Sequence, residues 1–360
     1  MNVFTGLNSM GKSSIIQALL ALRQSNDRGF LSKRGLVLKG DLVDLGVASE
    51  VLYQFAEVEE VQLGLDFIND QSFSWIFAYE INQDGKQVSY KDSDFVPFAE
   101  EQPERSTSNT TPLEEIGFFA QNLKYLSTER TVQNTYGRSD FEVKQHRNLG
   151  KNGEYTAHYL AEFGISEEVP KALHFKEGLP AHLLSQVAAW MSEISPGTNV
   201  KAEKIPGVDS VRLGYEFDTK NGKTKEVSPL NVGYGLTYVL PIIVAILIAK
   251  PGDILIIENP ESHVHPKGQS AIGRLIAMAA NYGVQLFIET HSDHIINGIR
   301  VAVKKGIPAE KVKLIFLSHG NFNDELYSNI SLPILDQDGR IDYWPPNFFD
   351  EWDNNLMELL

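Results

Sequence analysis

The stretch Gly6-Leu7-Asn8-Ser9-Met10-Gly11-Lys12-Ser13 decides the fold, because it fits the pattern G-x-x-x-x-G-K-[ST] of a phosphate-binding loop. That pattern is specific only when a strand precedes it and a helix follows it. Val3-Phe4-Thr5 has the composition of a strand end, and apolar residues recur at helical spacing from about Lys12 to Asn26. The local context that the pattern requires is therefore predicted on both sides.

The chemistry of this loop explains its residue types. Glycine lets backbone N–H groups close on phosphate oxygens, and the helix N-terminus adds a favourable dipole. We expect Lys12, exposed in the loop, to reach the β and γ phosphates, and Ser13 to ligate magnesium. The nucleotide-binding residues that we expect here are Asn8, Gly11, Lys12, Ser13 and Ser14. The alternative, an ordinary glycine-rich turn, requires a chance match expected in roughly one chain in a hundred. The loop therefore predicts binding of ATP with Mg²⁺.

A second signal lies in Asp253-Ile254-Leu255-Ile256-Ile257-Glu258-Asn259-Pro260-Glu261. Its continuous apolar run is typical of a central parallel strand, and its carboxylates follow at the end where open α/β sheets bind ligands. We expect Glu258 to hold Mg²⁺, directly or through water. The alternative, a strand that merely ends in acidic residues, loses force beside the phosphate-binding loop.

A third signal is Thr290-His291-Ser292, which follows the apolar run from Gln285 to Ile288. An imidazole at that position could donate a hydrogen bond to a γ-phosphate or to an attacking water, although a lone histidine is more often structural. A further apolar run spans Leu314 to Leu317, and a helix is predicted around Gln269 to Ala280. This alternation of strands and helices predicts an α/β fold with a parallel sheet.

The middle of the chain has a different pattern. Short β-prone stretches from Val51 to about Tyr90, with a turn at Asp84-Gly85, predict an antiparallel meander, and residues 91–112 have the composition of an exposed loop. Helical patterns at about 155–162 and 182–193 predict a helical insertion. The domains that we expect are 1–130 and 199–330 as the two parts of one head, 131–198 as an inserted helical arm, and 331–360 as a tail.

Composition limits the possible partners. The formal charge of −15 should repel nucleic acid and anionic membrane as a whole, so DNA contact would need a local basic patch. The best candidate is Arg138, Lys144, Arg147 and Lys151, with a solvated charged face as the alternative. The chain has no cysteine, which excludes thiolate chemistry and fits a reducing cytoplasm. Its longest apolar run, Leu236 to Ala249, is about 14 residues and too short to span a bilayer.

Together these motifs resemble the ABC/SMC/RecF class of AAA-family ATPases, in particular the stand-alone bacterial ATPases of the OLD-like and defence-associated kind. Trp344-Pro345 and Phe348-Phe349-Asp350 resemble the tail of one uncharacterised branch. The other matching segments are Gly6–Ser13 (Walker A), Asn231–Pro241 (signature), Ile254–Glu258 (Walker B), Glu261–Pro266 (the loop after Walker B) and Thr290–Ser292 (histidine switch).

The resemblance implies a P-loop NTPase fold of the ABC-ATPase head type, with an antiparallel β subdomain. In this class two heads sandwich two ATPs, so we expect a homodimer or higher oligomer. Asn231, Gly233 and Gly235 would then face the γ-phosphate held by the partner subunit, at the N-terminus of a helix that can bind an anion. Glu258, Glu261 and His291 are the expected catalytic residues. The resemblance also implies an effector protein encoded nearby and a role in anti-phage defence.

The sequence departs from that class at three places. Only five residues precede Gly6 where the class has a strand hairpin, so we expect the native start to lie upstream of Met1. Asn259 stands where ABC ATPases carry a second acid. Because it cannot take a proton, a general base must come from Glu261 or from elsewhere, or hydrolysis must be slow. About 70 residues follow His291, too few for the nuclease domain of OLD-like enzymes.

Two alternatives to an ATPase follow from these residues. The first is a scaffold that binds ATP with little hydrolysis and controls a partner nuclease or toxin. The second is a nuclease that uses Glu258, Glu261, His263 and His265 as metal ligands, since an H-x-H pair can bind zinc.

Overall fold

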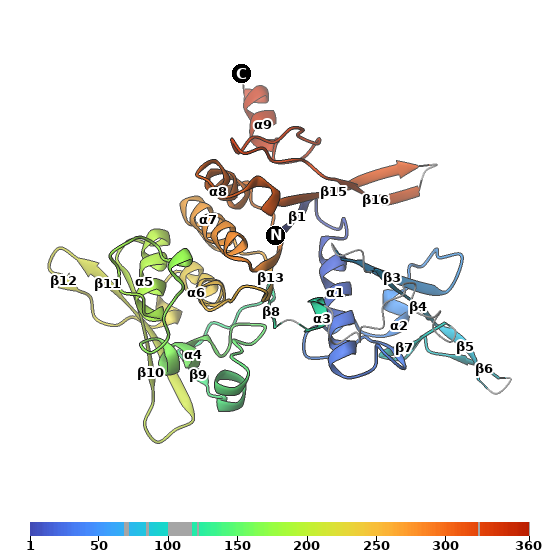
Figure 1. Cartoon of the computed structure of the whole chain (residues 1–360), viewed down its shortest axis with the longest axis horizontal. Helices are drawn as coiled ribbons and strands as arrows, with labels where there is room; N and C mark the ends of the chain where they lie inside the picture. The colour runs from blue at the N-terminus through green and yellow to red at the C-terminus, as the bar shows by residue number, and fades with distance from the viewer. Residues whose placement is uncertain (68–71, 84–85, 100–116, 121, 323–324, 360) are drawn as a thin grey trace. The chain divides into compact units, whose positions relative to one another are not determined.

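The computed structural model describes the chain except residues 68–71, 84–85, 100–116, 121, 323–324 and 360 (Figure 1). It divides into two compact units. The first comprises Met1–Lys12 and Asn122–Leu360, and the second comprises Ser13–Gln121. Each unit is described by itself below.

A six-stranded sheet forms the centre of the first unit, in the order β16-β15-β1-β14-β13-β8. All neighbours are parallel except β15 and β16. The strands are β1 (Asn2–Gly6), β8 (Leu123–Leu126), β13 (Ile254–Glu258), β14 (Gln285–Glu289), β15 (Lys313–Phe322) and β16 (Glu325–Ser331). The parallel strands predicted from continuous apolar runs are thus confirmed, and their register sets Phe4 opposite Glu289 and Glu289 opposite Glu258.

Helices α6 (Tyr234–Leu247), α7 (Pro266–Tyr282) and α8 (Asp293–Lys304) belong to the same unit, and η5 (Ala309–Lys311) precedes β15. A β-carbon on Gly273 of α7 would lie 2.2 Å from the carbonyl oxygen of Ile295, and one on Gly298 of α8 would lie 2.2 Å from that of Ser270. These two glycines therefore let α7 and α8 approach each other closely (Figure 1).

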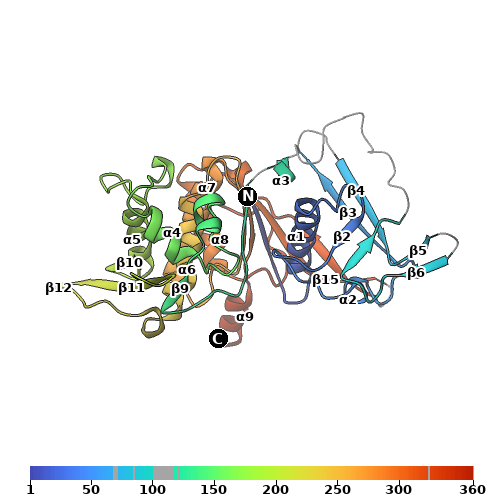
Figure 2. The same cartoon turned by 90° about the horizontal axis from the view of Figure 1, so that it is seen from below.

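Residues 131–198 contain the predicted helices. They form β9 (Thr135–Gly137), η2 (Phe141–Gln145), α4 (Thr156–Phe163), η3 (Lys171–Leu173) and α5 (Leu183–Ile194). A second sheet joins β9 to β10 (Thr198–Lys204), β11 (Ser210–Thr219) and β12 (Gly222–Lys223), and α4 and α5 lie over one face of it (Figure 2). Leu160 and Val187 are buried in the same apolar core as α6, so these helices pack into the first unit. The boundaries proposed from the sequence stay a prediction.

The second unit holds the antiparallel β subdomain. Its strands pair as β2 (Gly35–Val37) with β7 (Phe95–Pro97), β3 (Glu60–Asp66) with β4 (Ser72–Ala78), and β5 (Glu80–Gln83) with β6 (Lys86–Ser89). Its helices are α1 (Lys12–Asp27, whose first residue belongs to the other unit), α2 (Ala48–Val51) and α3 (Gly117–Ala120). The loop predicted over 91–112 is wrong at β7, where Val96 is buried and pairs with Leu36. The Asp84-Gly85 turn and residues 100–112 lie outside the described residues.

The C-terminal residues are ordered against the first unit, ending in helix α9 (Glu351–Leu359). Phe348 is fully buried against Phe316 of β15, with their ring centroids 5.1 Å apart. Within the described part of the chain, no helix combines the length and the apolar character needed to cross a membrane.

Candidate functional site

The phosphate-binding loop depends on its glycines. Gly6 has a φ of 133°, and a β-carbon there would lie 2.0 Å from the carbonyl oxygen of Leu317 in β15. Gly11 has a φ of 86°, also in the region that favours glycine. Between them Leu7, Asn8 and Ser9 are exposed. The loop therefore turns tightly at both ends and presents its middle to solvent.

Lys12 is not exposed as the sequence led us to expect; only 4% of it is accessible. Its ammonium donates hydrogen bonds to the carbonyl oxygens of Gly6 (3.0 Å) and Leu7 (2.6 Å). Burial lowers the pKa of Lys12, and the negative charge of Glu289 opposes that shift. The expectation was wrong because the loop folds over its own lysine. Ser13 and Ser14 are exposed in the first turn of α1 and begin the second unit.

Glu258 ends β13 and is held by Tyr125 of β8 and by Thr128, which follows that strand. Tyr125 Oη donates to its Oε1 at 3.0 Å, and Thr128 donates to its Oε2 from Oγ1 at 2.9 Å and from its backbone N–H at 3.3 Å. These bonds fix the carboxylate and occupy about three of its four lone-pair sites, so that the remaining one is on Oε1. Oxygen ligands of this kind suit Mg²⁺, so the residue type and its fixed position fit the predicted metal role.

Arg130, two residues beyond Thr128, is buried beside Glu258. Only 6% of it is accessible, and its Nη2 donates to the backbone carbonyl oxygen of Glu258 at 2.8 Å. Its Nε and Nη1 are buried and have no hydrogen-bond partner among the described residues. Burial lowers the pKa of Arg130 to about 10, although Glu258 and Glu261 favour its charged form. The sequence feature that could have indicated this position is that Arg130 closely follows the strand β8.

Glu261 ties the loop after β13 to the switch segment. Its Oε2 accepts a hydrogen bond from Thr290 Oγ1 at 2.8 Å, and its Oε1 accepts one from the backbone N–H of His291 at 2.6 Å. Burial raises the pKa of Glu261 against the effect of these bonds. Ser292 then caps α8 by accepting from the N–H of Ile295 at 3.1 Å. The predicted residues Glu261 and His291 are thus in contact.

His291 and Glu289 interact electrostatically with Lys12 of the phosphate-binding loop. The pKa of His291 is lowered by burial and, to a lesser degree, by the positive charge of Lys12. Glu289, which ends β14 and is 4% accessible, acts electrostatically on the same lysine. Sequence reasoning missed Glu289, although the rule applied to Glu258, a carboxylate at the end of a buried parallel strand, would have found it.

The signature residues surround the start of α6. Asn231 ends the short helix η4 (Pro229–Asn231), Gly233 precedes α6, and Gly235 lies in its first turn. A β-carbon on Gly235 would lie 2.2 Å from the carbonyl oxygen of His263, whereas one on Gly233 would meet nothing within 4 Å. These residues border a hollow of about 490 Å³ that is also lined by residues 263–265. The role of this loop toward a partner stays a prediction.

The structure does not bring the proposed nuclease ligands together. His263 packs against Tyr234 and Tyr238, with centroid distances of 6.0 and 4.8 Å, while His265 Nδ1 accepts the N–H of Lys267 at 3.3 Å and caps α7. Glu261 is committed to the switch segment. Among the described residues, the group of acids and histidines close enough to share a metal is a different one.

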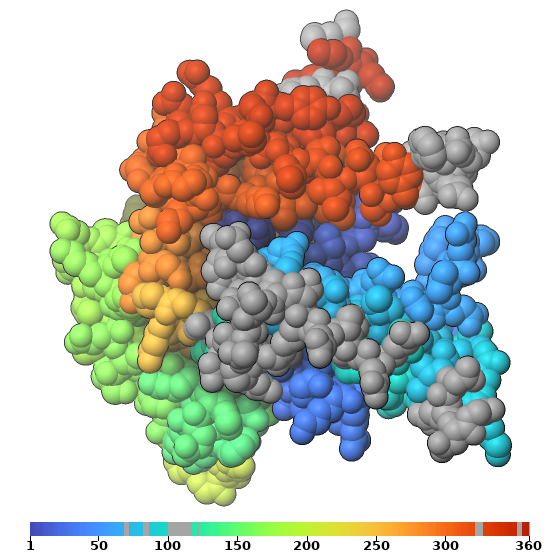
Figure 3. All heavy atoms as spheres, turned by 45° about the vertical axis from the view of Figure 1, so that its right-hand side comes forward, coloured from blue at the N-terminus to red at the C-terminus, as the bar shows by residue number. Residues whose placement is uncertain are grey.

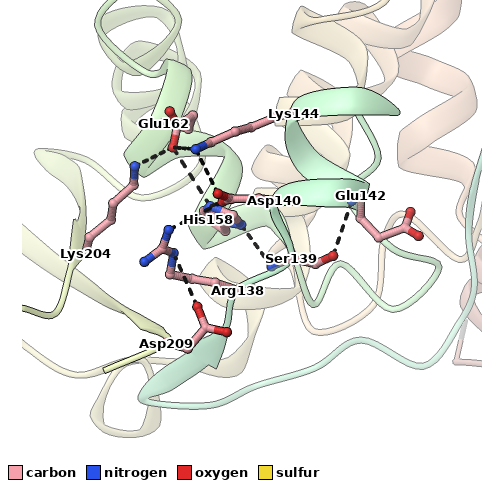
Figure 4. Close-up of polar contacts among 9 residues, drawn as sticks. All are labelled: Arg138, Ser139, Asp140, Glu142, Lys144, His158, Glu162, Lys204 and Asp209. Carbon is pink, nitrogen blue, oxygen red and sulfur yellow. Dashed lines mark hydrogen bonds and ion pairs between the residues drawn. The ribbon is translucent and has the colours of Figure 1, made fainter. Parts of the chain in front are cut away.

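That group is Asp140, His158 and Glu162 (Figure 4). His158 is fully buried, and its Nδ1 accepts the backbone N–H of Ser139 at 3.3 Å. In the neutral ring Nε2 therefore carries the proton and has no lone pair for a metal. Asp140 and Glu162 are also bound by Lys144, at 2.9 and 3.6 Å, so their charges are already compensated. The arrangement fits an internal ion-pair network rather than a metal site.

The same network contains half of the basic stretch. Arg138 lies 3.4 Å from Asp140 and 3.7 Å from Asp209 (Figure 4). Arg147 pairs with Glu167 at 3.4 Å, and its guanidinium lies 3.8 Å from the centre of the Phe163 ring. Three of the four proposed DNA-contacting residues thus have acidic partners. The geometry favours the alternative, an ordinary charged face.

Comparison with protein families shows the family of the chain. Residues 1–297 match the family described as "AAA domain, putative AbiEii toxin, Type IV TA system". The chain belongs to this AAA family. Its fold is therefore that of a P-loop ATPase domain, as the loop and the parallel sheet indicate. Residues 307–359 match a second family, described as "Protein of unknown function (DUF3696)". A comparison with curated proteins finds no match.

Three solved structures to which this chain is similar are SMC head domains. The head bound to the C-winged helix domain of ScpA is 10% identical, with 93% of this chain and 90% of that chain covered and a TM-score of 0.41. The SMC head domain from Thermotoga maritima is 11% identical, with 92% of this chain and 89% of that chain covered and a TM-score of 0.38. The Smc head domain with an extended coiled coil, bound to the C-terminal domain of ScpA derived from Pyrococcus furiosus, is 11% identical. The match covers 99% of this chain and 92% of that chain, with a TM-score of 0.42. These scores are too low to support an argument about the site.

Proposed function

We propose that this protein is an ATPase that binds ATP with Mg²⁺ and hydrolyses it slowly. One observation supports the proposal: Lys12, Glu258, Glu261 and His291 end or closely follow the parallel strands β1, β13 and β14, at the carboxyl edge of one sheet. His291 is bonded to Glu261 and senses the charge of Lys12, and Glu258 lies beside Glu289 in the sheet. Open α/β sheets bind their ligands at this edge.

Each residue has a role in this proposal. The phosphates would draw the Lys12 ammonium from the carbonyls of Gly6 and Leu7, and the backbone N–H groups of the loop would bind their oxygens. Ser13 and Glu258 would hold Mg²⁺, which supplies charge neutralisation when bound. His291 would donate to the γ-phosphate or to the attacking water. Glu261 would accept the proton of that water, because Asn259 cannot.

The proposal extends to assembly. We propose that ATP joins two copies, with Asn231, Gly233 and Gly235 of each facing the nucleotide of the other. Hydrolysis would release this clamp and thereby control an effector protein encoded nearby. The AAA family is named for a putative toxin of a toxin–antitoxin system, which supports a defence setting, including defence against phage. A chain without cysteine suits the cytoplasm.

A scaffold with little turnover is the second candidate, and a specific observation favours it. Both carboxylate oxygens of Glu261 already accept hydrogen bonds from the switch segment, which lowers their capacity to take a proton. In this version the bound nucleotide alone sets the state of the partner. Hydrolysis would serve only to reset it.

Three measurements on the purified chain test these proposals. Titration with a fluorescent ATP analogue measures binding, phosphate release measures turnover, and light scattering with ATP or ADP measures assembly. We expect Mg²⁺-dependent binding, slow phosphate release and association with ATP only. A folded chain that does not bind the analogue would contradict the proposal. Binding with no phosphate release would select the scaffold.

A further inference from the structure

Exposed apolar side chains are concentrated in the C-terminal part of the chain. Nine of the 19 large exposed hydrophobic residues in the described structure lie between Tyr327 and Leu359. Single exposed hydrophobic residues need no explanation, but clusters mark interaction surfaces. Figure 3 shows the C-terminal part of the chain, coloured orange to red, at the surface of the molecule.

The exposure alternates along the chain. Ile330, Leu332 and Ile334 are 54%, 54% and 66% accessible, while Pro333 and Leu335 between and after them are buried. Side chains of an extended chain point alternately to opposite sides, so these three form one row. We call Ile330, Leu332 and Ile334 the exposed row.

The exposed row is held in place by ordered structure. Leu335, Ile341 and Phe348 are buried in the apolar core of the first unit. Arg300 Nε donates to the carbonyl oxygen of Gly339 at 2.7 Å, and Gln337 Nε2 donates to that of Val303 at 2.9 Å. The row is thus presented by a fixed backbone, which lowers the entropy cost of binding to it.

The row begins on a strand with an open edge. β16 is the outermost strand of the sheet and, among the described strands, pairs with β15 alone. Natural edge strands are usually protected by lysine, proline or a bulge, but Tyr327–Ser331 contains no lysine or proline. The hairpin of β15 and β16 extends away from α7 and α8 (Figure 1). Such an edge can accept a further strand by backbone hydrogen bonding.

The charge of the C-terminal residues indicates which kind of partner can bind the exposed row. Residues 332–360 contain seven acidic residues and one basic residue, Arg340. A second copy would bring the same negative charge, and nucleic acid is anionic throughout, so both would be repelled. We propose that the exposed row and the edge of β16 bind an extended segment of a partner protein, apolar at alternate positions and rich in lysine or arginine.

The docking surface also reaches the phosphate-binding loop. Ser328 occupies the position two residues before Ile330, and a β-carbon on Gly11 would lie 3.6 Å from its Oγ. Nucleotide at the loop and a partner on the strand would therefore influence each other's affinity by the same factor. This coupling rests on the proposed ATP binding, whereas the docking surface does not.

The docking surface is tested with two synthetic peptides of eight residues, one alternating lysine with isoleucine and one with glutamate in place of lysine. Fluorescence anisotropy measures their binding to the full chain without nucleotide. We expect the lysine peptide to bind at least about tenfold tighter than the glutamate peptide. The double variant Ile330→Ser with Leu332→Ser should lose at least about tenfold of that affinity.

Ile165→Ser is the matched control, since Ile165 is 75% accessible and lies outside the C-terminal segment. It should bind the lysine peptide like the parent, and thermal melts of all variants should coincide. Equal binding of both peptides, undiminished binding by the double variant, or a dimer that the double variant abolishes would overturn the docking proposal. ATP binding, measured separately on each variant, distinguishes this result from a failure of the proposed function.

Discussion

Lys12 combines a predicted role with an unexpected position, because its ammonium is bonded to the Gly6 and Leu7 carbonyls of its own loop. In Lys12→Ala the phosphates lose a charged donor, and hydrogen bonds to charged groups contribute about 1.5–3 kcal/mol each. We expect ATP affinity to fall by about a hundredfold, as measured with a fluorescent ATP analogue. Lys305→Ala, which removes an exposed lysine elsewhere, should bind ATP like the parent.

Glu261 gives the proposed hydrolysis a pH dependence. Burial raises its pKa, so the folded protein favours the protonated form, and this contribution to stability is lost as the pH rises through the raised pKa. A base must be deprotonated, so turnover should fall as the pH drops, with an acid limb above the ordinary glutamate value. We expect Glu261→Gln to lower turnover by about a hundredfold and to remove that limb from the pH–rate profile. An unchanged limb would assign it to another group.

We expect the hydrogen bond from Arg130 to Glu258 to stabilise the end of the Walker B strand, β13. Arg130→Met removes the donor to the part-buried Glu258 carbonyl, and an unsatisfied buried acceptor costs about 1–3 kcal/mol. We expect the free energy of unfolding, measured in urea, to fall by that amount, and turnover to fall because Glu258 shifts. Arg130→Lys keeps one charged donor and should recover part of both losses. Two variants equal in turnover and stability to the parent would show that this bond has no influence.

At the scale of elements, the strands with long apolar runs could be predicted from sequence because each residue of the run is buried. Ile254–Ile257 of β13 is the clearest example. β7 could not be predicted, since its three residues pair with β2, about 60 positions earlier in the chain. The same holds for the candidate site. Glu258 belongs to a sequence motif and could be proposed from it. Tyr125 and Arg130 could not, because each contacts a residue more than 125 positions away in the chain.

Of the two signature glycines at the start of α6, Gly233 allows a sharper test of the loop than Gly235. A side chain on Gly235 would collide with the carbonyl oxygen of His263, so Gly235→Asp would disturb the loop itself. Gly233 has open space around it and lies directly before the helix. Gly233→Asp should place a carboxylate against the partner's γ-phosphate and block ATP-induced dimerisation in light scattering. ATP binding by the monomer should remain, and undiminished dimerisation would exclude this loop from the interface.

At the scale of the whole molecule, net charge and local pairing together decide whether the basic stretch binds DNA. The chain carries a charge of −15, and Arg138, Lys144 and Arg147 each lie within 4 Å of a carboxylate. A phosphate backbone would therefore have to displace acidic partners that are already in position, while the remaining charge repels it.

If these three residues and Lys151 all contacted phosphates, the logarithm of the DNA affinity would fall with a slope of about −3.6 against the logarithm of salt concentration. We expect a much smaller slope, and we expect neutralisation of all four by glutamine to leave it unchanged in a filter-binding titration. A steep slope that this variant flattens would restore the sequence hypothesis of a DNA contact. In that case the carboxylates of Asp140, Glu162 and Glu167 would have to release their partners, and replacing them with amides should tighten DNA binding further.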